Sequence, residues 1–459
     1  MHNKSPRPFG ARDKFGYLFG DFGNDFTFIL STTILMKFYT DVMGVCAAIV
    51  GGIMMFARFV DAFTDVTMGR ICDRSPITAA GKFKPWILRM CGPVAIASFL
   101  MYQSSLAHMN MGLKTAYLFV TYILWGSVFY TSVNIPYGSM ASSISADPEH
   151  RQSLSTYRTM GGMLASAVIG IIVPLLAYQK VDGQETLVGS RVTLIAGVFS
   201  LLAVGCYLLC YAWTTERVHA VQAPKQTVST GRMLKNALKS RALISIIAAS
   251  IVMLLSQLTM QGMAGYIYPQ YYNSAAAQSA STLLMMVAMG IAAAAAKPLA
   301  VKFGKAEMAA ASSVFAVAMC LVTWFLRPQN VWVYTLLQSL NWLGLGIFSM
   351  VSWALITDVI DDSELKNGVR EDGSVYALYS FARKLGQAAA AGLSGALLSF
   401  IGYSEATKND PQVLEGVFDI ATLVPAIGFA ALALILWLWY PLHKKQVDAN
   451  VKALAEKRM

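Results

Sequence analysis

Charged residues are scarce in this sequence. Asp, Glu, Lys and Arg make up only 13% of the 459 residues, whereas hydrophobic residues make up 56%. A soluble protein of this length needs more charge to cover its surface, so the composition indicates a polytopic membrane protein. The net charge of +11 does not indicate a nucleic-acid partner, because basic cytoplasmic loops give membrane proteins the same excess.

Residues that carry catalytic chemistry are also few. Histidines such as His2, His108 and His150 fall outside the long apolar stretches, and we find no Cys-His, Ser-His or metal-ligand cluster. We therefore expect no catalytic residue, no metal site and no cofactor. The six cysteines are expected to be free thiols. The first residues are polar and basic and lack the features of a cleavable signal, so the first apolar stretch should remain as an anchor.

Twelve apolar stretches are each long enough to cross a bilayer core. They lie near 15–40, 45–70, 85–107, 114–140, 153–178, 191–213, 243–270, 279–301, 307–326, 331–357, 374–401 and 416–440. We therefore predict an all-α membrane protein with an N-terminal six-helix half (1–213), a cytoplasmic central loop (214–242) and a C-terminal six-helix half with a cytoplasmic tail (243–459). Basic residues cluster at the start, after the second stretch and in the central loop, which predicts that both termini are cytoplasmic.

Two pseudo-symmetric halves of six helices are typical of transporters with a binding site at the membrane midplane. After the second stretch, GRICDR followed by GKFK resembles the cytoplasmic loop signature of the major facilitator superfamily. Asp73 and Arg74 in this motif are predicted to form a cytoplasmic gate, and the alternative is a solvated charged turn. The acidic segment 358–372 is likewise expected to be a loop, serving either as a gate or as a solvated turn.

The second apolar stretch carries Arg58, Asp61 and Asp65 near its middle. Spacings of three and four residues place all three on one helix face. That face is expected to point at protein or water, because ionised groups at mid-membrane are costly. Two carboxylates against one arginine leave a charge for a proton or another cation, which favours an ion-coupled transporter over a purely structural ion triad.

Other polar residues lie inside the predicted spans. A site for a polyhydroxyl ligand is expected to use carboxylate, amide, basic and aromatic side chains: Asp25, Tyr130, Asn134, Arg158, Trp353 and Lys384. Packing or interfacial roles are the alternative for Trp353 and the tyrosines. Pro136 is expected to interrupt the fourth span. Only one of Arg383 and Lys384 can face the site directly, since adjacent helix positions diverge by ~100°.

The chain resembles the glycoside-pentoside-hexuronide:cation symporters, whose best-known member is the melibiose carrier. The resemblance covers nearly the whole chain and rests on FGDFGNDF, YTDVMGV, ARFVDAFTDVTMGRICDRS, GKFKPWIL, TYILWG with NIPYGS, and WALITDVIDDSELKNGVREDGSVYALYSFARKLG. It implies that Asp61, Asp65 and Thr131 form the cation site. It also implies that residues matching Asp25, Arg158, Tyr130 and Lys384 serve the sugar or lie between the two sites.

Three departures from the melibiose carrier bear on specificity. Thr64 replaces a cation-binding asparagine, Asn134 replaces a sugar-binding aspartate, and Gly138 replaces a tryptophan. The last two resemble the glucuronide carrier branch, whereas Asp25 would repel an anionic sugar and favours a neutral glycoside or pentoside. A single carboxylate suffices for a proton, so we expect protons to drive transport, with sodium at best a weak substitute, and Asp61, Asp65, Thr64 and Thr131 at the cation site.

The sequence leaves three function classes open. We expect a cation-coupled sugar symporter in the cytoplasmic (inner) membrane, acting as a monomer in the lipid bilayer with a small sugar as its substrate. A hexuronide symporter is the alternative within this class. The other two classes are an exporter or exchanger of another polar metabolite on the same fold, and a non-transporting sensor or enzyme.

Overall fold

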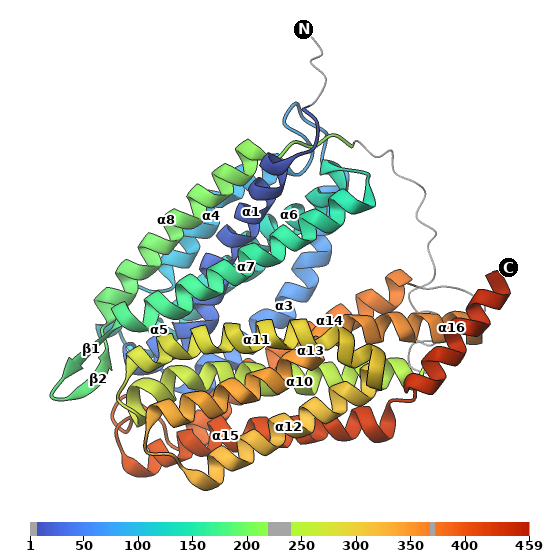
Figure 1. Cartoon of the computed structure of the whole chain (residues 1–459). Coiled ribbons are helices and arrows are strands. Elements are labelled where there is room, and N and C mark those ends of the chain that lie inside the picture. Colours follow the sequence, from blue (N-terminus) through green and yellow to red (C-terminus); the bar gives the residue numbers. More distant parts are fainter. Residues whose placement is uncertain (1–6, 219–239, 368–371, 459) are drawn as a thin grey trace. The chain divides into compact units, whose positions relative to one another are not determined.

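The computed structural model describes residues 7–218, 240–367 and 372–458. Almost all of these residues are helical (Figure 1). The chain divides into two compact units, Met1–Lys225 with Tyr403–Lys408 and Gln226–Gly402 with Asn409–Met459. We call them the first and the second unit and describe each by itself.

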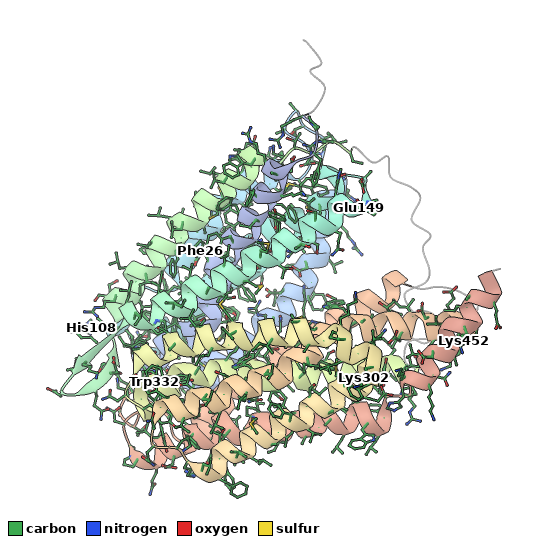
Figure 2. All side chains as sticks on the ribbon, in the orientation of Figure 1. Phe26, His108, Glu149, Lys302, Trp332 and Lys452 are labelled. Atoms are coloured by element: carbon green, nitrogen blue, oxygen red, sulfur yellow. The ribbon has the colours of Figure 1, made fainter. Side chains whose placement is uncertain are left out.

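The first unit contains eleven helical elements and one β-hairpin within its described residues. The helices are α1 (Ala11–Leu30), η1 (Ser31–Leu35), α2 (Met36–Asp41), α3 (Ala47–Arg74), α4 (Lys84–Leu100), η2 (Ser104–His108), α5 (Met111–Ile123), η3 (Leu124–Tyr130), α6 (Thr131–Ile144), α7 (Pro148–Ala177) and α8 (Gly189–Trp213). Helix α1 packs along both α7 and α8. Phe26 of α1, labelled in Figure 2, is 3% exposed and stacks on Phe199 of α8.

The second unit is built from long helices as well. They are α10 (Arg241–Tyr266), η4 (Ile267–Tyr271), α11 (Ala275–Phe303), α12 (Lys305–Leu326), α13 (Val331–Asn367), α14 (Asp372–Phe400), α15 (Pro411–Leu434), η5 (Ile435–Trp439) and α16 (Lys444–Arg458). Helix α13 packs on α11 and α12, and α10 packs on α14 and α15. A core of small and aliphatic side chains joins these helices.

Ten helices in the described part of the chain are long and apolar enough to cross a membrane. The other two predicted spans coincide with the continuous segment α1–η1–α2 and with α14, which carry more charge, such as Asp21 and Asp25 in the former and Arg383 in the latter. Large apolar side chains such as Phe63 (75% exposed) and Phe325 (74%) lie on the outside of their helices. Such surfaces suit contact with lipid chains.

The acidic segment that we expected to be a loop from 358 onward is helical instead. Helix α13 continues to Asn367, and two of its acids have lysine partners, one on α12 and one on α13 itself. Asp358 lies 2.5 Å from Lys305 Nζ, and Asp362 lies 2.6 Å from Lys366 Nζ, one turn further on. Residues 368–371 lie outside the described residues.

The fourth predicted span is not interrupted at Pro136, which lies inside the continuous helix α6. The irregular part comes earlier, as the π-helical stretch η3. Thr131 Oγ1 lies 3.2 Å from the carbonyl oxygen of Gly126 in this stretch. Single π-turns inside α-helices occur frequently at functional sites, because the extra residue turns the following side chains.

The sequence analysis also missed a β-hairpin between α7 and α8. Strands β1 (Tyr178–Val181) and β2 (Gln184–Leu187) pair antiparallel. Asp182 and Gly183 at the turn have φ values of 51° and 81°. Two positive φ values at a two-residue connection give the turn that Asp-Gly pairs favour in hairpins.

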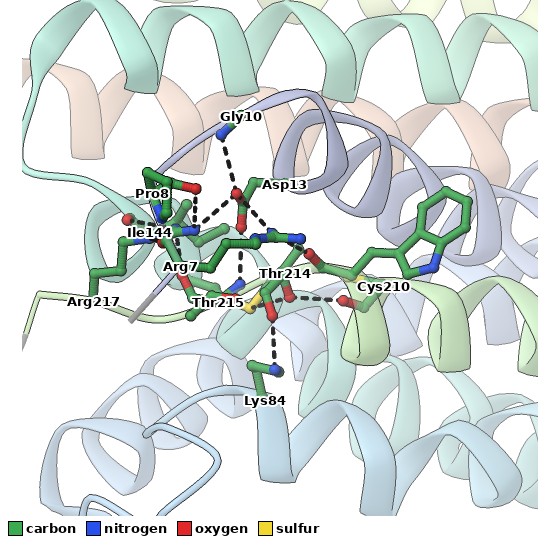
Figure 3. A network of polar contacts seen from close by, with 12 residues as sticks. Arg7, Pro8, Gly10, Asp13, Lys84, Ile144, Cys210, Thr214, Thr215 and Arg217 are labelled. Atoms are coloured by element: carbon green, nitrogen blue, oxygen red, sulfur yellow. Dashed lines mark hydrogen bonds and ion pairs between the residues drawn. The ribbon is translucent and has the colours of Figure 1, made fainter. Parts of the chain in front are cut away.

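A polar network closes one end of the first unit (Figure 3). The buried carboxylate of Asp13 accepts hydrogen bonds from the backbone N–H groups of Gly10 (3.2 Å) and Thr215 (3.0 Å) and from Arg217 Nη2 (2.9 Å). Residues 214–218 of the predicted central loop therefore pack on the first unit. The remaining loop residues up to 239 lie outside the described residues.

Candidate functional site

The charged side chains of α3 lie against the π-helical stretch and α6. Arg58 Nη1 lies 3.3 Å from Asp61 Oδ2, three residues along the same helix. Asp61 is only 9% exposed. The guanidinium of Arg58 also stands over the ring of Phe28 from α1, 4.9 Å from its centre. A buried carboxylate thus has a charged partner on its own helix, and the arginine has an aromatic partner on another.

Hydroxyl groups from the neighbouring segment η3–α6 bind two carboxylates of α3, those of Asp61 and Asp65. Ser127 Oγ donates a hydrogen bond of 2.5 Å to Asp61 Oδ1. Thr131 Oγ1 donates one of 2.9 Å to Asp65 Oδ1. The structure therefore brings the predicted residue Thr131 to Asp65. Ser127, the partner of Asp61, was not predicted from the sequence. Its position four residues before Thr131, on the same helix face, was an available signal.

Thr64 contributes its hydroxyl to its own helix. Its Oγ1 donates to the carbonyl oxygens of Val60 (3.3 Å) and Asp61 (3.2 Å). The hydroxyl proton is therefore used by the backbone, and only the lone pairs of this oxygen could meet a cation.

A second acidic cluster lies between α1 and α7. Arg158 Nε lies 3.0 Å from Asp21 Oδ1, and this ion pair joins residues 137 positions apart in the chain. A Cβ atom built on Gly162 would lie 2.7 Å from Asp25 Oδ2 and 3.3 Å from Asp21 Oδ2. Asp21 and Asp25, one helical turn apart, therefore both face the same glycine. In the part of the chain that the structure describes, we find no ion pair of Asp25.

The polar residues of α6 face α1 and α7. Asn134 Oδ1 accepts a long hydrogen bond of 3.5 Å from Asn24 Nδ2, and Tyr207 of α8 donates one of 2.8 Å to Asn24 Oδ1. The ring of Tyr130 stacks on Phe28 at 5.6 Å. A Cβ atom on Gly138 would lie 3.6 Å from Arg158 Nη1. The first unit thus gathers its predicted sugar residues on neighbouring faces of α1, the segment η3–α6 and α7.

Two predicted sugar residues, Trp353 and Lys384, belong to the second unit. The ring of Trp353 meets Tyr379 edge to face at 5.1 Å. The guanidinium of Arg383 lies over both rings, 5.8 Å from the Trp353 centre and 5.9 Å from the Tyr379 centre. Tyr379 in turn accepts a hydrogen bond of 2.7 Å from Ser250 Oγ. Arg383, which shares the α14 sequence with Lys384, is thus packed on aromatic rings.

The predicted gate residues Asp73 and Arg74 end α3 and are both exposed. Lys82 Nζ donates a hydrogen bond of 2.9 Å to the carbonyl oxygen of Asp73. The loop that follows is held by Glu216, whose carboxylate accepts the backbone N–H groups of Lys82 (2.8 Å), Phe83 (2.9 Å) and Lys84 (2.9 Å). Glu216, which follows α8, thus holds the loop that carries the GKFK motif.

The side chains of both acidic clusters can bind polar ligands and can balance the charge of a bound cation. Carboxylate, amide and phenol groups can accept or donate hydrogen bonds to hydroxyl groups, and carboxylates can take up a proton. Within the described residues, no group of three or more His, Cys, Asp or Glu side chains could hold a metal ion.

Comparison with known proteins places this arrangement in a family. The chain matches the family model described as MFS/sugar transport protein over residues 16–444. It is 32% identical over 449 residues to an uncharacterized symporter, YjmB, of Bacillus subtilis (strain 168), covering 97% of this chain and 95% of that protein. It is 31% identical over 456 residues to an isoprimeverose transporter of Lactiplantibacillus pentosus, covering 97% and 93%.

A solved structure supports the fold. The nucleoside transporter NupG covers 92% of this chain and 98% of its own at a TM-score of 0.64, with 14% sequence identity. The predicted major facilitator fold is therefore confirmed. Since the family and its members in this comparison are transporters, the enzyme alternative is excluded. The chain belongs to the MFS/sugar transport protein family and is a multi-pass membrane transporter.

Proposed function

We propose that this protein imports a neutral glycoside or pentoside together with a proton, by alternating access. The observation that carries the proposal is the pairing of two α3 carboxylates with hydroxyl groups of the neighbouring segment, Asp61 with Ser127 and Asp65 with Thr131. A proton or cation that binds one of these carboxylates must alter a contact between α3 and the continuous segment η3–α6. Cation occupancy can therefore be transmitted to the helix that also carries Tyr130 and Asn134.

In this proposal Asp61, Asp65 and Thr131 form the cation site, and Thr64 borders it. The side-chain oxygens at this site suit a proton better than a sodium ion. Both oxygens of Asp61 already accept hydrogen bonds, from Ser127 and Arg58, and the Thr64 hydroxyl donates to the backbone. Sodium, as a hard cation, takes several oxygen ligands at once, whereas a proton takes one carboxylate oxygen.

We assign the sugar to the second cluster and its neighbours. Asp25, Asn134, Tyr130 and Arg158 of the first unit would bind hydroxyl groups. In the second unit Trp353 would cover an apolar face of the sugar ring and Lys384 would bind a further hydroxyl group. A relative that transports isoprimeverose, by its name, supports a sugar of this size and polarity. The net negative charge of the Asp21–Asp25–Arg158 cluster argues against the hexuronide alternative.

We further propose that the protein acts as a monomer in the cytoplasmic membrane with both termini in the cytoplasm. Asp73 and Arg74 would then lie at the cytoplasmic gate, next to the loop that Glu216 holds. Export or exchange of another polar metabolite is the second candidate, because the same fold supports either direction.

The test uses the purified protein in sodium-free proteoliposomes, with isoprimeverose and a panel of neutral methyl glycosides as probes. We expect addition of a transported sugar to make the outer medium more alkaline, as protons enter with the sugar. Uptake that strictly requires sodium, without a change in pH, would contradict proton coupling. Efflux driven by an opposite gradient, with no uptake, would favour the exporter.

A further inference from the structure

Asp21 is a residue of the candidate site for which the sequence analysis gave no role. Its carboxylate lies 3.0 Å from Arg158 Nε, and the side chains of Asp21 and Arg158 are 14% and 39% exposed. The guanidinium also stands over the ring of Tyr137, 5.2 Å from its centre. An acid on one side and an aromatic ring on the other therefore hold Arg158 in place.

The approach of α7 to α1 explains why this pair forms. A Cβ atom on Gly161 would lie 2.5 Å from the carbonyl oxygen of Leu18, closer than a real Cβ contact allows. The absence of side chains at Gly161 and Gly162 lets the two helices meet, and Arg158 lies one turn before this point. Its guanidinium consequently reaches Asp21 and leaves Nη1 on the side of Gly138.

The charge of the cluster follows from this geometry. A guanidinium is the side chain best suited to bind a carboxylate or sulfonate, through two parallel hydrogen bonds. Here Asp21 already occupies the Nε edge, and Asp25 lies one turn away on the same face of α1. An acidic group on a sugar could use this edge only by displacing Asp21, and at the other donors it would still approach two carboxylates.

We propose that Asp21 is a specificity determinant, which occupies Arg158 and thereby makes the site select neutral sugars over acidic ones. This inference rests on the proposed sugar transport and adds a residue that sets the charge of the substrate. Asp21 acts through Arg158, and the remaining donors of the guanidinium stay available to a neutral hydroxyl group.

The experiment replaces Asp21 by Asn, which keeps the shape of the side chain and removes its charge. The readout is a ratio in proteoliposomes: inhibition of labelled neutral-glycoside uptake by a hexuronate, relative to inhibition by the matching neutral sugar. We expect Asp21→Asn to raise this ratio about tenfold in favour of the hexuronate. Asp182→Asn, at the exposed hairpin turn, should leave the ratio unchanged.

Two further variants keep the result decisive. Asp21→Glu retains the charge and should keep the preference for neutral sugars, even if its packing lowers total uptake. Adding Arg158→Gln to Asp21→Asn should abolish the gain in hexuronate inhibition. An unchanged ratio in an Asp21→Asn protein that still transports neutral sugar would overturn the role of Asp21, whereas a wild-type protein that transports no sugar would instead overturn the proposed function.

Discussion

The two acidic clusters of the first unit have the same composition and different construction. Each contains two aspartates four residues apart and one arginine: Asp61 and Asp65 with Arg58, and Asp21 and Asp25 with Arg158. In the first, the arginine lies three residues from its acid on the same helix. In the second, it reaches its acid from a helix 137 positions further along the chain.

The surroundings of the carboxylates differ as well. Those of the α3 cluster accept hydrogen bonds from Ser127 and Thr131, whereas those of the α1 cluster face a glycine. Fixed hydroxyl donors suit a site that holds a small cation in one geometry. A carboxylate beside bare backbone leaves its oxygens for the hydroxyl groups of a larger ligand. The comparison therefore suggests a division of labour, which substitutions can test one cluster at a time.

The largest effect is expected in the α3 cluster. Asp65→Asn and Asp61→Asn each remove a charge that the coupling proton would neutralise, so sugar accumulation against a gradient should be abolished. Exchange of labelled sugar across the membrane, which needs no net proton movement, should persist in part. If both variants accumulate sugar normally, the coupling role of this cluster is wrong.

Asp25→Ala should weaken sugar binding rather than cation coupling. A charge-assisted hydrogen bond contributes about 1.5–3 kcal/mol, so loss of one should weaken sugar binding roughly tenfold or more. The measurement is the sugar dissociation constant by calorimetry, with the sodium or proton dependence recorded in parallel. A normal dissociation constant would remove Asp25 from the sugar site.

Thr131 and Thr64 sharpen the comparison within the α3 cluster. Thr131→Val removes a hydrogen bond that stabilises the ionised Asp65 carboxylate, so it should raise the affinity for a coupling proton by about tenfold. Thr64→Val removes a bond to the helix backbone only and should change it by about twofold or less. The apparent cation affinity of uptake, measured for both variants side by side, checks the order. Equal effects would mean that both hydroxyls meet the cation.

The smallest effect on sugar affinity is expected at Gly162. A methyl group there would lie 2.7 Å from Asp25 Oδ2, so Gly162→Ala should push this carboxylate aside. Because the end of an Asp side chain can move, the cost should stay near 1 kcal/mol, or about fivefold in sugar affinity. Gly205→Ala on α8 is the matched control, since its Cβ would meet nothing within 4 Å. Loss of thermal stability in Gly162→Ala with unchanged sugar affinity would contradict the expected effect of Gly162 on sugar binding by Asp25.

Contacts between residues close in the chain could be predicted from the sequence. The spacing of Arg58, Asp61 and Asp65 predicts a shared face, and the structure pairs Arg58 with Asp61. Each predicted span coincides with a long helical segment, because length and hydropathy decide both. Asp21 escaped notice because its partner comes from another helix. The hairpin at Asp182 escaped because short polar links between spans carry little periodic signal, although Asp-Gly was a usable cue.

The network around Asp13 bears on how this protein is made. Arg217 binds Asp13 from 204 residues further along the chain, and Glu216 binds the N–H groups that open α4. A ribosome releases these partners only after every helix from α1 to α8 has been translated. Until then Asp13 has only near neighbours such as Arg7 and Gly10. The first unit can therefore complete its polar closure only late in synthesis, when residues 215–217 have left the ribosome and before most of the second unit exists.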